Sequence, residues 1–206
     1  MKNNTTNILI SGVGGQGILL ASEILSEALM LAGFDVKKNE IHGMSQRGGS
    51  VVSHIRFGAK VYSSIIPEGE GDVLLGFELL ETYRYLPLLR KGAKVLANDL
   101  KIFPAPVNLG KAVYPNDIPE RIARHFPGST LVPGLDLALE AGDPRTVNVV
   151  LLGALSGSID IEPGHWLEIL HKMVPERFLA VNLKAFELGR RTASATGQAV
   201  QEGATA

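Results

Sequence analysis

Apolar and polar positions recur along the chain with two different periods, and their order predicts an α/β fold. The run "NILISG" at 7–12 is typical of a short buried strand that ends in glycine. Apolar residues then recur at helical spacing from Gln16 to Ala32, and Gly33 ends this run. "FDVKKNEIHG" at 34–43 indicates a second strand. A strand, a helix and a strand in this order predict the start of a parallel sheet that is covered by helices.

The pattern further along predicts more strands and helices. "SVVSHIRFG" and "VYSSII" both alternate, so we expect an antiparallel hairpin that turns at Gly58–Lys60. We expect further strands at 72–77, 93–99 and 129–134, a proline-rich connector at 103–108, and helices at 78–92, 119–126, 135–142, 145–157, 164–174 and 175–191. The helix at 145–157 is almost wholly apolar, which predicts burial on several sides. The expected fold class is a three-layer α/β/α Rossmann-like sheet, mostly parallel with an inserted antiparallel hairpin.

Length and composition fit one globular domain. The chain has 206 residues, of which 45% are hydrophobic and 20% charged. We expect the domain to cover residues 1–191 and the small, polar tail at 192–206 to be disordered. The net charge of −1 supplies no basic field for nucleic acid or for an anionic membrane. The polar start "MKNNTTN" and the lack of an apolar run of about 20 residues predict a cytoplasmic protein with no membrane contact.

The sequence contains no cysteine. This excludes disulfides, thiolate zinc sites, a cysteine nucleophile and cysteine-ligated iron–sulfur clusters within it. If the protein takes part in redox chemistry, the electron carriers therefore belong to another chain.

The loop "SGVGGQGI" at 11–18 follows a predicted strand, opens a predicted helix and matches the pattern G-x-G-x-x-G. Such a loop lets the backbone approach a phosphate, and the helix N-terminus adds N–H groups and partial positive charge. A dinucleotide site also needs an acid about 20 residues later, at the end of the second strand. Glu40 lies near that place, whereas Asp35 lies at the start of the strand. NAD(P), another anion or partner group, and tight packing alone stay open for the candidate residues Gly12, Gly14, Gly15, Gln16 and Gly17.

A second polar loop, "HGMSQRGG" at 42–49, follows the second predicted strand. Loops at the carboxyl ends of neighbouring parallel strands lie side by side, so we expect both loops at one rim of one crevice. Arg47 offers a planar cation that suits carboxylate or phosphate. His42 is weighed as a base and Ser45 as a nucleophile, but neither has evident partners in the sequence. His54 and Arg56 share one strand face, for which we expect solvation. The candidates of this loop are Ser45, Gln46, Arg47, Gly48 and Gly49.

The two loops at this separation resemble a known family. "GVGGQG" at 12–17 and "EIHGMSQRGGSVVSHIRFG" at 40–58 are similar to the gamma-type domain of the 2-oxoacid:ferredoxin oxidoreductases, in particular to the small subunit of the indolepyruvate branch. "PEGEGDVLLGFELLETYRYLPLLRKGAKVLAND", "NVVLLGALSG" and "VNLKAFELG" continue the resemblance. It extends from Asn7 to Gly189, nearly the whole chain.

The resemblance implies a role in the oxidative decarboxylation of a 2-oxoacid with coenzyme A, giving acyl-CoA, CO2 and reduced ferredoxin. It implies that a large alpha subunit carries thiamine diphosphate and iron–sulfur clusters, so this chain holds no cofactor alone and is inactive alone. The two loops would then face the alpha subunit and coenzyme A rather than NAD. An aryl pyruvate such as indolepyruvate is the expected substrate. Pyruvate, a branched-chain oxoacid, 2-oxoglutarate, an NAD(P)-dependent oxidoreductase and a noncatalytic assembly protein remain alternatives.

Overall fold

The computed structural model describes residues 5–43 and 48–203, with side chains described as far as residue 192. The strands are β1 (Thr6–Val13), β2 (Asp35–His42), β3 (Ser50–Gly58), β4 (Gly71–Gly76), β5 (Leu89–Asn98) and β6 (Thr130–Val132). The helices are α1 (Ile18–Leu31), α2 (Leu79–Tyr85), α3 (Ala105–Asn108), α4 (Ile118–His125), α5 (Gly134–Ala141), α6 (Val147–Ser156), α7 (Pro163–Met173) and α8 (Glu176–Gly203), with 3-10 turns η1 (Leu86–Leu88) and η2 (Pro144–Thr146).

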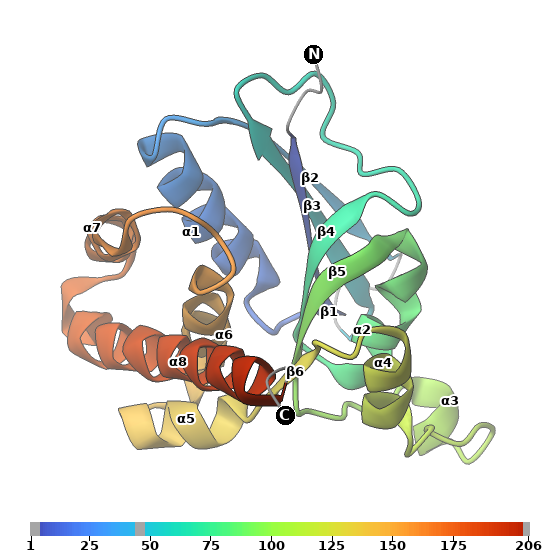
Figure 1. The fold of residues 1–206 in the computed structure, drawn as a ribbon. Helices are drawn as coiled ribbons and strands as arrows, with labels where there is room; N and C mark the ends of the chain where they lie inside the picture. The colour runs from blue at the N-terminus through green and yellow to red at the C-terminus, as the bar shows by residue number, and fades with distance from the viewer. Residues whose placement is uncertain (1–4, 44–47, 204–206) are drawn as a thin grey trace.

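The six strands form one sheet in the order β2-β3-β1-β4-β5-β6. β1, β4, β5 and β6 pair in parallel, whereas β3 is antiparallel to both of its neighbours. Helices cover both faces of the sheet (Figure 1). The predicted α/β/α class, mostly parallel with an antiparallel part, is therefore confirmed.

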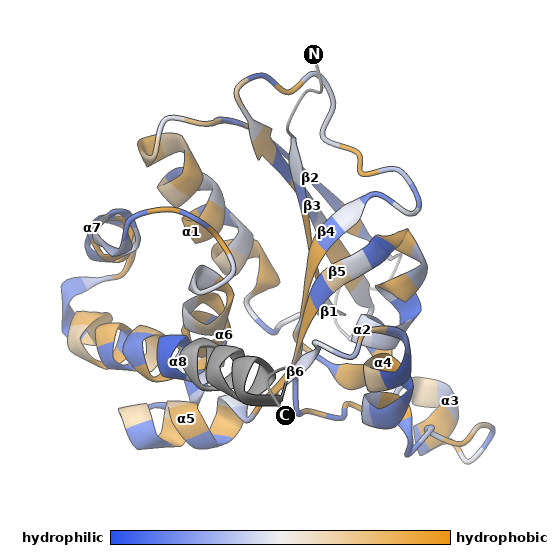
Figure 2. Ribbon diagram, in the orientation of Figure 1, coloured by the Kyte–Doolittle hydropathy of each residue, from blue (hydrophilic) through white to orange (hydrophobic). Residues whose placement is uncertain are grey.

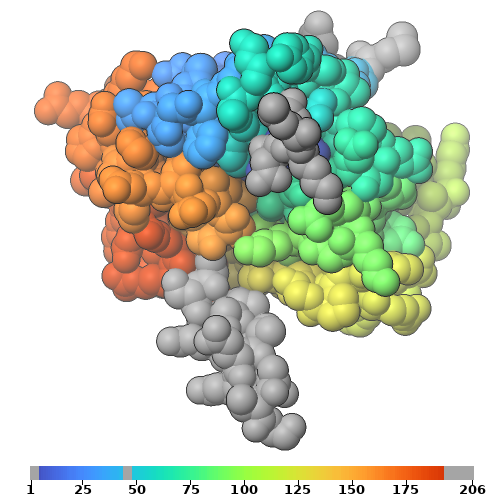
Figure 3. Space-filling model, turned by 45° about the horizontal axis from the view of Figure 1, so that its top comes forward, coloured from blue at the N-terminus to red at the C-terminus, as the bar shows by residue number. Residues whose placement is uncertain are grey.

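Each sheet face has its own apolar core. Ile8 and Ile10 of β1 point to the face covered by α1, α5, α6, α7 and α8, while Leu9 points to the face covered by α2 and α4. Apolar residues in β1, β4 and β5 account for the orange sheet interior in Figure 2. α7 lies against α1 (Figure 3), and Lys172 pairs with Glu27 at 3.0 Å between the two helices. Continuous apolar strands are typical of a sheet buried on both faces.

α6 confirms the prediction of burial on several sides, because every residue from Asn148 to Ser156 is buried. α6 and α8 approach so closely that a Cβ at Gly153 would overlap the carbonyl oxygen of Phe186. A Cβ at Gly189 would likewise overlap the carbonyl oxygen of Val150. The two glycines thus allow one helix backbone to pack directly on the other.

Two predicted strand pairings are wrong. The hairpin does not turn at Gly58–Lys60, because residues 61–66 form no strand and β3 pairs instead with β2 and β1. The hairpin consists of β2 and β3, which residues 43–49 connect. β3 also separates β2 from β1, so the first two strands of the chain run in the same direction without being neighbours. Periodicity identifies a strand, but it does not specify the strand's partner.

Side chains of β3 hold residues 61–66 in place of a strand partner. The backbone N–H of Ile66 donates to His54 Nδ1 at 3.1 Å, and Arg56 donates to the carbonyl oxygens of Ser63 and Ile65. The predicted solvation of His54 is therefore wrong, because its side chain is buried, whereas Arg56 is partly exposed. The two do share a strand face. Burial lowers the pKa of His54, which keeps Nδ1 available as an acceptor.

Two further segments differ from the simple pattern. The predicted connector at 103–108 contains the short helix α3. The backbone of α8 is helical to Gly203, within the segment 192–206 for which the sequence predicts a tail; the domain boundary at residue 191 stays a prediction. In the described part of the chain, no helix has the length and apolarity needed to cross a bilayer.

Candidate functional site

The first glycine loop connects the carboxyl end of β1 to α1 and has a backbone that suits glycine. Gly15 and Gly17 have φ values of 103° and 80°, a region that side-chain-bearing residues rarely adopt. A Cβ at Gly12 would lie 2.7 Å from Gln16 Oε1 and 2.7 Å from Phe77 Cβ, so packing requires glycine there. The described first turn of α1 has neither a capping side chain nor an acidic residue. Its N–H groups lack intrahelical partners and can receive an anion.

Gln16 points its amide into the protein rather than toward a ligand. Its Oε1 accepts from the backbone N–H of Val13 at 2.6 Å, and its Nε2 donates to the carbonyl oxygen of Phe77 at 2.9 Å. The latter oxygen also accepts from Asn98 Nδ2 at 3.1 Å. Gln16 therefore joins the first loop to the ends of β4 and β5.

The described end of the second loop lies beside the first loop, as the sequence predicts. The backbone N–H of Gly14 donates to the carbonyl oxygen of Gly49 at 2.8 Å, and Gly43 N–H donates to the carbonyl oxygen of Ser50 at 3.0 Å. Gly48 has a φ of 73°. The contact arises because β3 starts beside the end of β1, with Val13 opposite Ser50, and not because β1 and β2 are neighbours.

The remaining predicted residues of this loop, Ser45, Gln46 and Arg47, lie outside the described residues. Their proposed ligand contacts, like those of the glycines, stay predictions. His42 is described: it is exposed, and its Nε2 lies 3.6 Å from a carboxylate oxygen of Glu40. Glu40 itself accepts from Ser22 Oγ at 3.0 Å and from Lys38 Nζ at 3.2 Å. Glu40 stands on the outermost strand β2, with β3 between it and the first loop, which does not match the acid position of a dinucleotide site.

Two buried carboxylates behind the loops were not found from the sequence. Glu81 Oε2 accepts from Ser50 Oγ at 2.6 Å, and the Tyr85 hydroxyl lies 3.2 Å from the same Oγ. Glu81 also pairs with Arg84 at 3.2 Å. Because Ser50 begins β3 directly after Gly49, these contacts fix the point at which the second loop enters the sheet. The other carboxylate, Glu78, caps α2 by accepting from Glu81 N–H at 2.8 Å. An acid before a helical run is a capping signal that sequence reasoning could have used.

A cavity of about 220 Å³ adjoins the first loop and was also missed. It is lined by Leu20 of the first turn of α1 and by residues of η2, α6 and α8. Arg145 forms a two-pronged pair with Asp143, with distances of 3.0 and 2.6 Å to Oδ2, and lies over the Phe178 ring at 5.2 Å from its centroid. Asn148 contacts the position of Gly17, where a Cβ would lie 2.9 Å from its Nδ2. The cavity therefore adds polar groups to the same rim.

This α/β domain with two joined glycine loops at the carboxyl ends of its strands belongs to a class of oxidoreductase subunits. The sequence matches the pyruvate ferredoxin/flavodoxin oxidoreductase family over residues 7–192. The chain belongs to this family, and it is a small subunit of a 2-oxoacid:ferredoxin oxidoreductase.

Two similar relatives are both indolepyruvate oxidoreductase subunit IorB. The protein of Pyrococcus horikoshii is 44% identical over 192 residues, which cover 91% of this chain and 95% of the relative. That of Thermococcus kodakarensis is 43% identical over 196 residues, with the same coverage of 91% and 95%.

Solved structures agree on the fold. The gamma subunit of a keto/oxoacid ferredoxin oxidoreductase from Geobacter sulfurreducens has a TM-score of 0.69 at 24% identity, over 92% of this chain and 99% of that one. A 2-oxoglutarate:ferredoxin oxidoreductase from Magnetococcus marinus, solved with 2-oxoglutarate, coenzyme A and succinyl-CoA bound, has a TM-score of 0.72 at 25% identity. The alignment covers 93% of this chain but 31% of that larger one.

Proposed function

We propose that this chain supports the coenzyme A-dependent oxidation of an aryl pyruvate, with indolepyruvate as the first candidate. The observation that carries this proposal is the bond between Gly14 and Gly49, which joins two glycine loops beside the uncapped start of α1. The substrate class comes from the two relatives named indolepyruvate oxidoreductase subunit IorB. Relatives named for 2-oxoglutarate or for pyruvate and ketoisovalerate are only 28% and 26% identical to this chain.

The first loop suits the phosphates of coenzyme A. Free N–H groups at a helix start and positive-φ glycines let a phosphate oxygen approach the backbone closely. Arg145 lines the adjoining cavity and adds a cation, although its pairing with Asp143 reduces the charge it offers. Coenzyme A supplies the thiol that receives the acyl group. This chain contributes binding and orientation, with backbone donors of the first loop and Arg47 as the groups in contact.

Thiamine diphosphate and iron–sulfur clusters belong, in this proposal, to a large alpha subunit. The chain has no cysteine for a cluster. It also has no Gly-Asp-Gly segment followed by an Asn-Asn pair, which is the sequence signature of a thiamine diphosphate site. Ferredoxin receives the electrons through the complex, which we place in the cytoplasm.

Coexpression with the large subunit tests the proposal. The purified complex should reduce a viologen dye with indolepyruvate only when coenzyme A is present, and this chain alone should reduce none. A panel of indolepyruvate, phenylpyruvate, pyruvate, 2-oxoisovalerate and 2-oxoglutarate ranks the substrates. Titration of the chain with coenzyme A and, under the same conditions, with NAD shows which of the two ligands it binds. Tight NAD binding without a coenzyme A response, or dye reduction by the chain alone, would overturn the proposal.

A further inference from the structure

The segment 100–116 between β5 and α4 projects from the fold and displays apolar side chains. α3 and the chain that follows it extend away from the sheet at the lower right of Figure 1, and Figure 2 shows apolar positions among polar ones along this segment. Phe103 is 52% exposed, Leu109 68% and Val113 87%. We call residues 100–116 the apolar arm. Contiguous exposed apolar surface is one mark of an interaction site.

The arm is ordered by its own hydrogen bonds, so its exposed tip is not a frayed loop. Around α3, the N–H groups of Leu109 and Lys111 donate to the carbonyl oxygens of Ala105 and Pro106 at 3.0 and 2.8 Å. The side chain of Asn108 donates to the carbonyl oxygen of Phe103 at 2.8 Å. Three prolines further restrict the backbone. A surface that is already ordered loses little conformational entropy when it binds.

One buried carboxylate fixes both ends of the arm. Glu78 is 1% exposed, and its Oε1 accepts from Ile102 N–H at 3.1 Å and from the Tyr114 hydroxyl at 2.6 Å. Tyr114 is the only residue of the arm that is fully buried, and its ring packs edge-on against Phe103 at 5.3 Å between centroids. Burial, followed by the bond to Glu78, raises the pKa of Tyr114, so the hydroxyl remains a donor. The fold therefore holds the base of the arm firmly, while Leu109 and Val113 at its tip are largely exposed.

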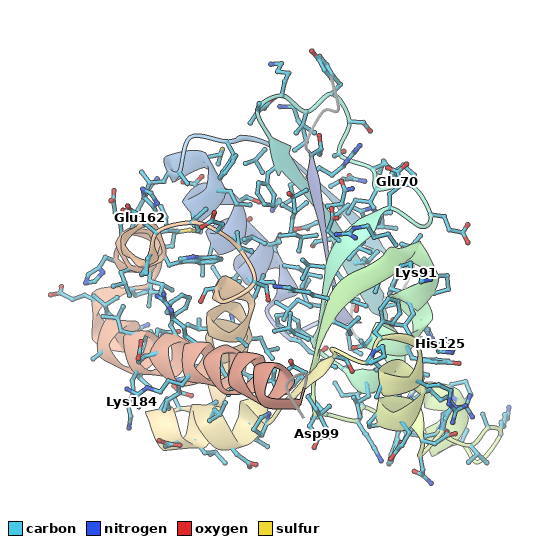
Figure 4. All side chains as sticks on the ribbon, viewed as in Figure 1. Glu70, Lys91, Asp99, His125, Glu162 and Lys184 are labelled. Atoms are coloured by element: carbon cyan, nitrogen blue, oxygen red, sulfur yellow. The ribbon has the colours of Figure 1, made fainter. Side chains whose placement is uncertain are left out.

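The arm stands at the same sheet edge as the glycine loops. It begins where β5 ends, and Asp99 at its base lies at the lower edge in Figure 4, opposite Glu70 at the upper right. The carbonyl oxygen of Phe77, next to Glu78, accepts from both Gln16 and Asn98. The anchor of the arm and the anchor of the first loop are thus consecutive residues after β4.

From these observations we infer that the apolar arm is a docking element for the large subunit, with Leu109 and Val113 inserting into an apolar recess of that subunit. This inference rests on the proposed function, which requires such a subunit. The arm contains Lys101 and Lys111, and Asp99 and Asp117 lie directly outside its two ends, so carboxylates of the partner are expected only beside the two lysines. Exposure that peaks at the tip, together with the shared edge, favours a protein partner that also reaches the glycine loops.

The test uses the full chain coexpressed with the tagged large subunit. The double variant Leu109→Asp/Val113→Asp should weaken subunit association by about 30-fold or more, the loss expected at an interface hot spot. The milder Leu109→Ser/Val113→Ser variant should weaken it in the same direction. The matched control is Leu135→Asp/Leu139→Asp on α5, where both leucines are also exposed, at 46% and 55%. Circular dichroism and thermal unfolding confirm that each variant folds.

The outcomes separate the inference from the proposed function. If the unaltered chain does not associate with the large subunit, the proposed function fails. If it associates and the arm variants do so equally well, or if the α5 control loses as much affinity as the arm variants, the docking role is wrong. Light scattering of the chain alone that shows a dimer lost in the arm variants would assign the arm to a second copy. Normal assembly and dye reduction with a reduced ferredoxin-linked rate would assign it to the electron acceptor. Both results overturn the inference.

Discussion

Replacing Gln16 by alanine tests whether the most conspicuous polar residue of the first loop acts from inside the protein. The change removes an acceptor 2.6 Å from Val13 N and a donor 2.9 Å from the Phe77 carbonyl oxygen. The Phe77 oxygen keeps its bond from Asn98, so this loss costs about 1 kcal/mol. The Val13 N–H is left without its partner in a residue only 8% exposed, which costs about 1–2 kcal/mol more.

The sum of about 2–3 kcal/mol corresponds to a fall in Tm of roughly 5–10 °C for a domain of this size. Thermal unfolding followed by circular dichroism measures it. The matched variant Gln16→Glu keeps the acceptor for Val13 but turns an oxygen toward the Phe77 oxygen, so it should also be destabilised. Asn108→Ala removes a side-chain hydrogen bond at an exposed site and should shift Tm much less. In the assembled complex, Gln16→Ala should raise the KM for coenzyme A more than it lowers kcat, because the loop donors lose their support. An unchanged Tm would refute this account of Gln16.

Three further predictions concern the frame around the site. Gly153→Ala should destabilise the protein by about 1–3 kcal/mol in urea unfolding, despite the better helix propensity of alanine, because the Cβ would meet the backbone of α8. The control Gly164→Ala, on the open side of α7, should be neutral or stabilising. A gain in stability at both sites would show that α6 and α8 are not in backbone contact. Tyr114→Phe should cost about 1–3 kcal/mol by removing a donor from the buried carboxylate at the start of α2, and full stability in the variant would contradict that bond. The pKa of His54 in the folded protein lies below its usual 6.5, so the contribution of His54 to folding stability is complete above about pH 6.5 and is lost as the pH falls below that value. His54→Gln should therefore reduce the difference in unfolding free energy between about pH 7.5 and about pH 5. An equal difference in the variant would exclude His54 as its source.

The sequence predicts the order of the elements well because the periods of 3.6 and 2 are strong along this chain. β1, α1, β4 and α6 appear where apolar spacing indicates them. The helix predicted at 78–92 is wrong in its last turn, because β5 begins at Leu89. Strand pairing was less predictable, because alternation at 61–66 is equally compatible with a strand and with an irregular segment that buries two apolar side chains. Val61 and Ile66 are buried there, and β3 side chains bind the backbone between them. The insertion of β3 between β1 and β2 likewise depends on tertiary packing and has no local signal in the sequence.

The candidate site was predicted in outline but not in the use of each side chain. The sequence indicates that the two loops meet, and the bond from Gly14 to Gly49 bears this out. It suggests Gln16 as a ligand group, whereas both ends of its amide are occupied within the fold. It gives no sign of Glu81, because a carboxylate on a predicted helix is usually solvated and only tertiary contact places it on Ser50.

The residues that follow β4 explain how one sheet edge can hold the first glycine loop and an exposed arm in a fixed relation. The Phe77 carbonyl oxygen receives Gln16 from the first loop, and the Glu78 carboxylate receives Ile102 and Tyr114 from the arm. Since the two acceptors are adjacent in the chain, neither loop nor arm can move far without breaking a buried bond. Unpaired buried acceptors are costly, so this junction resists independent motion of the two parts. A subunit that binds the arm would therefore contact the glycine loops at a relative position that is fixed before the subunits assemble.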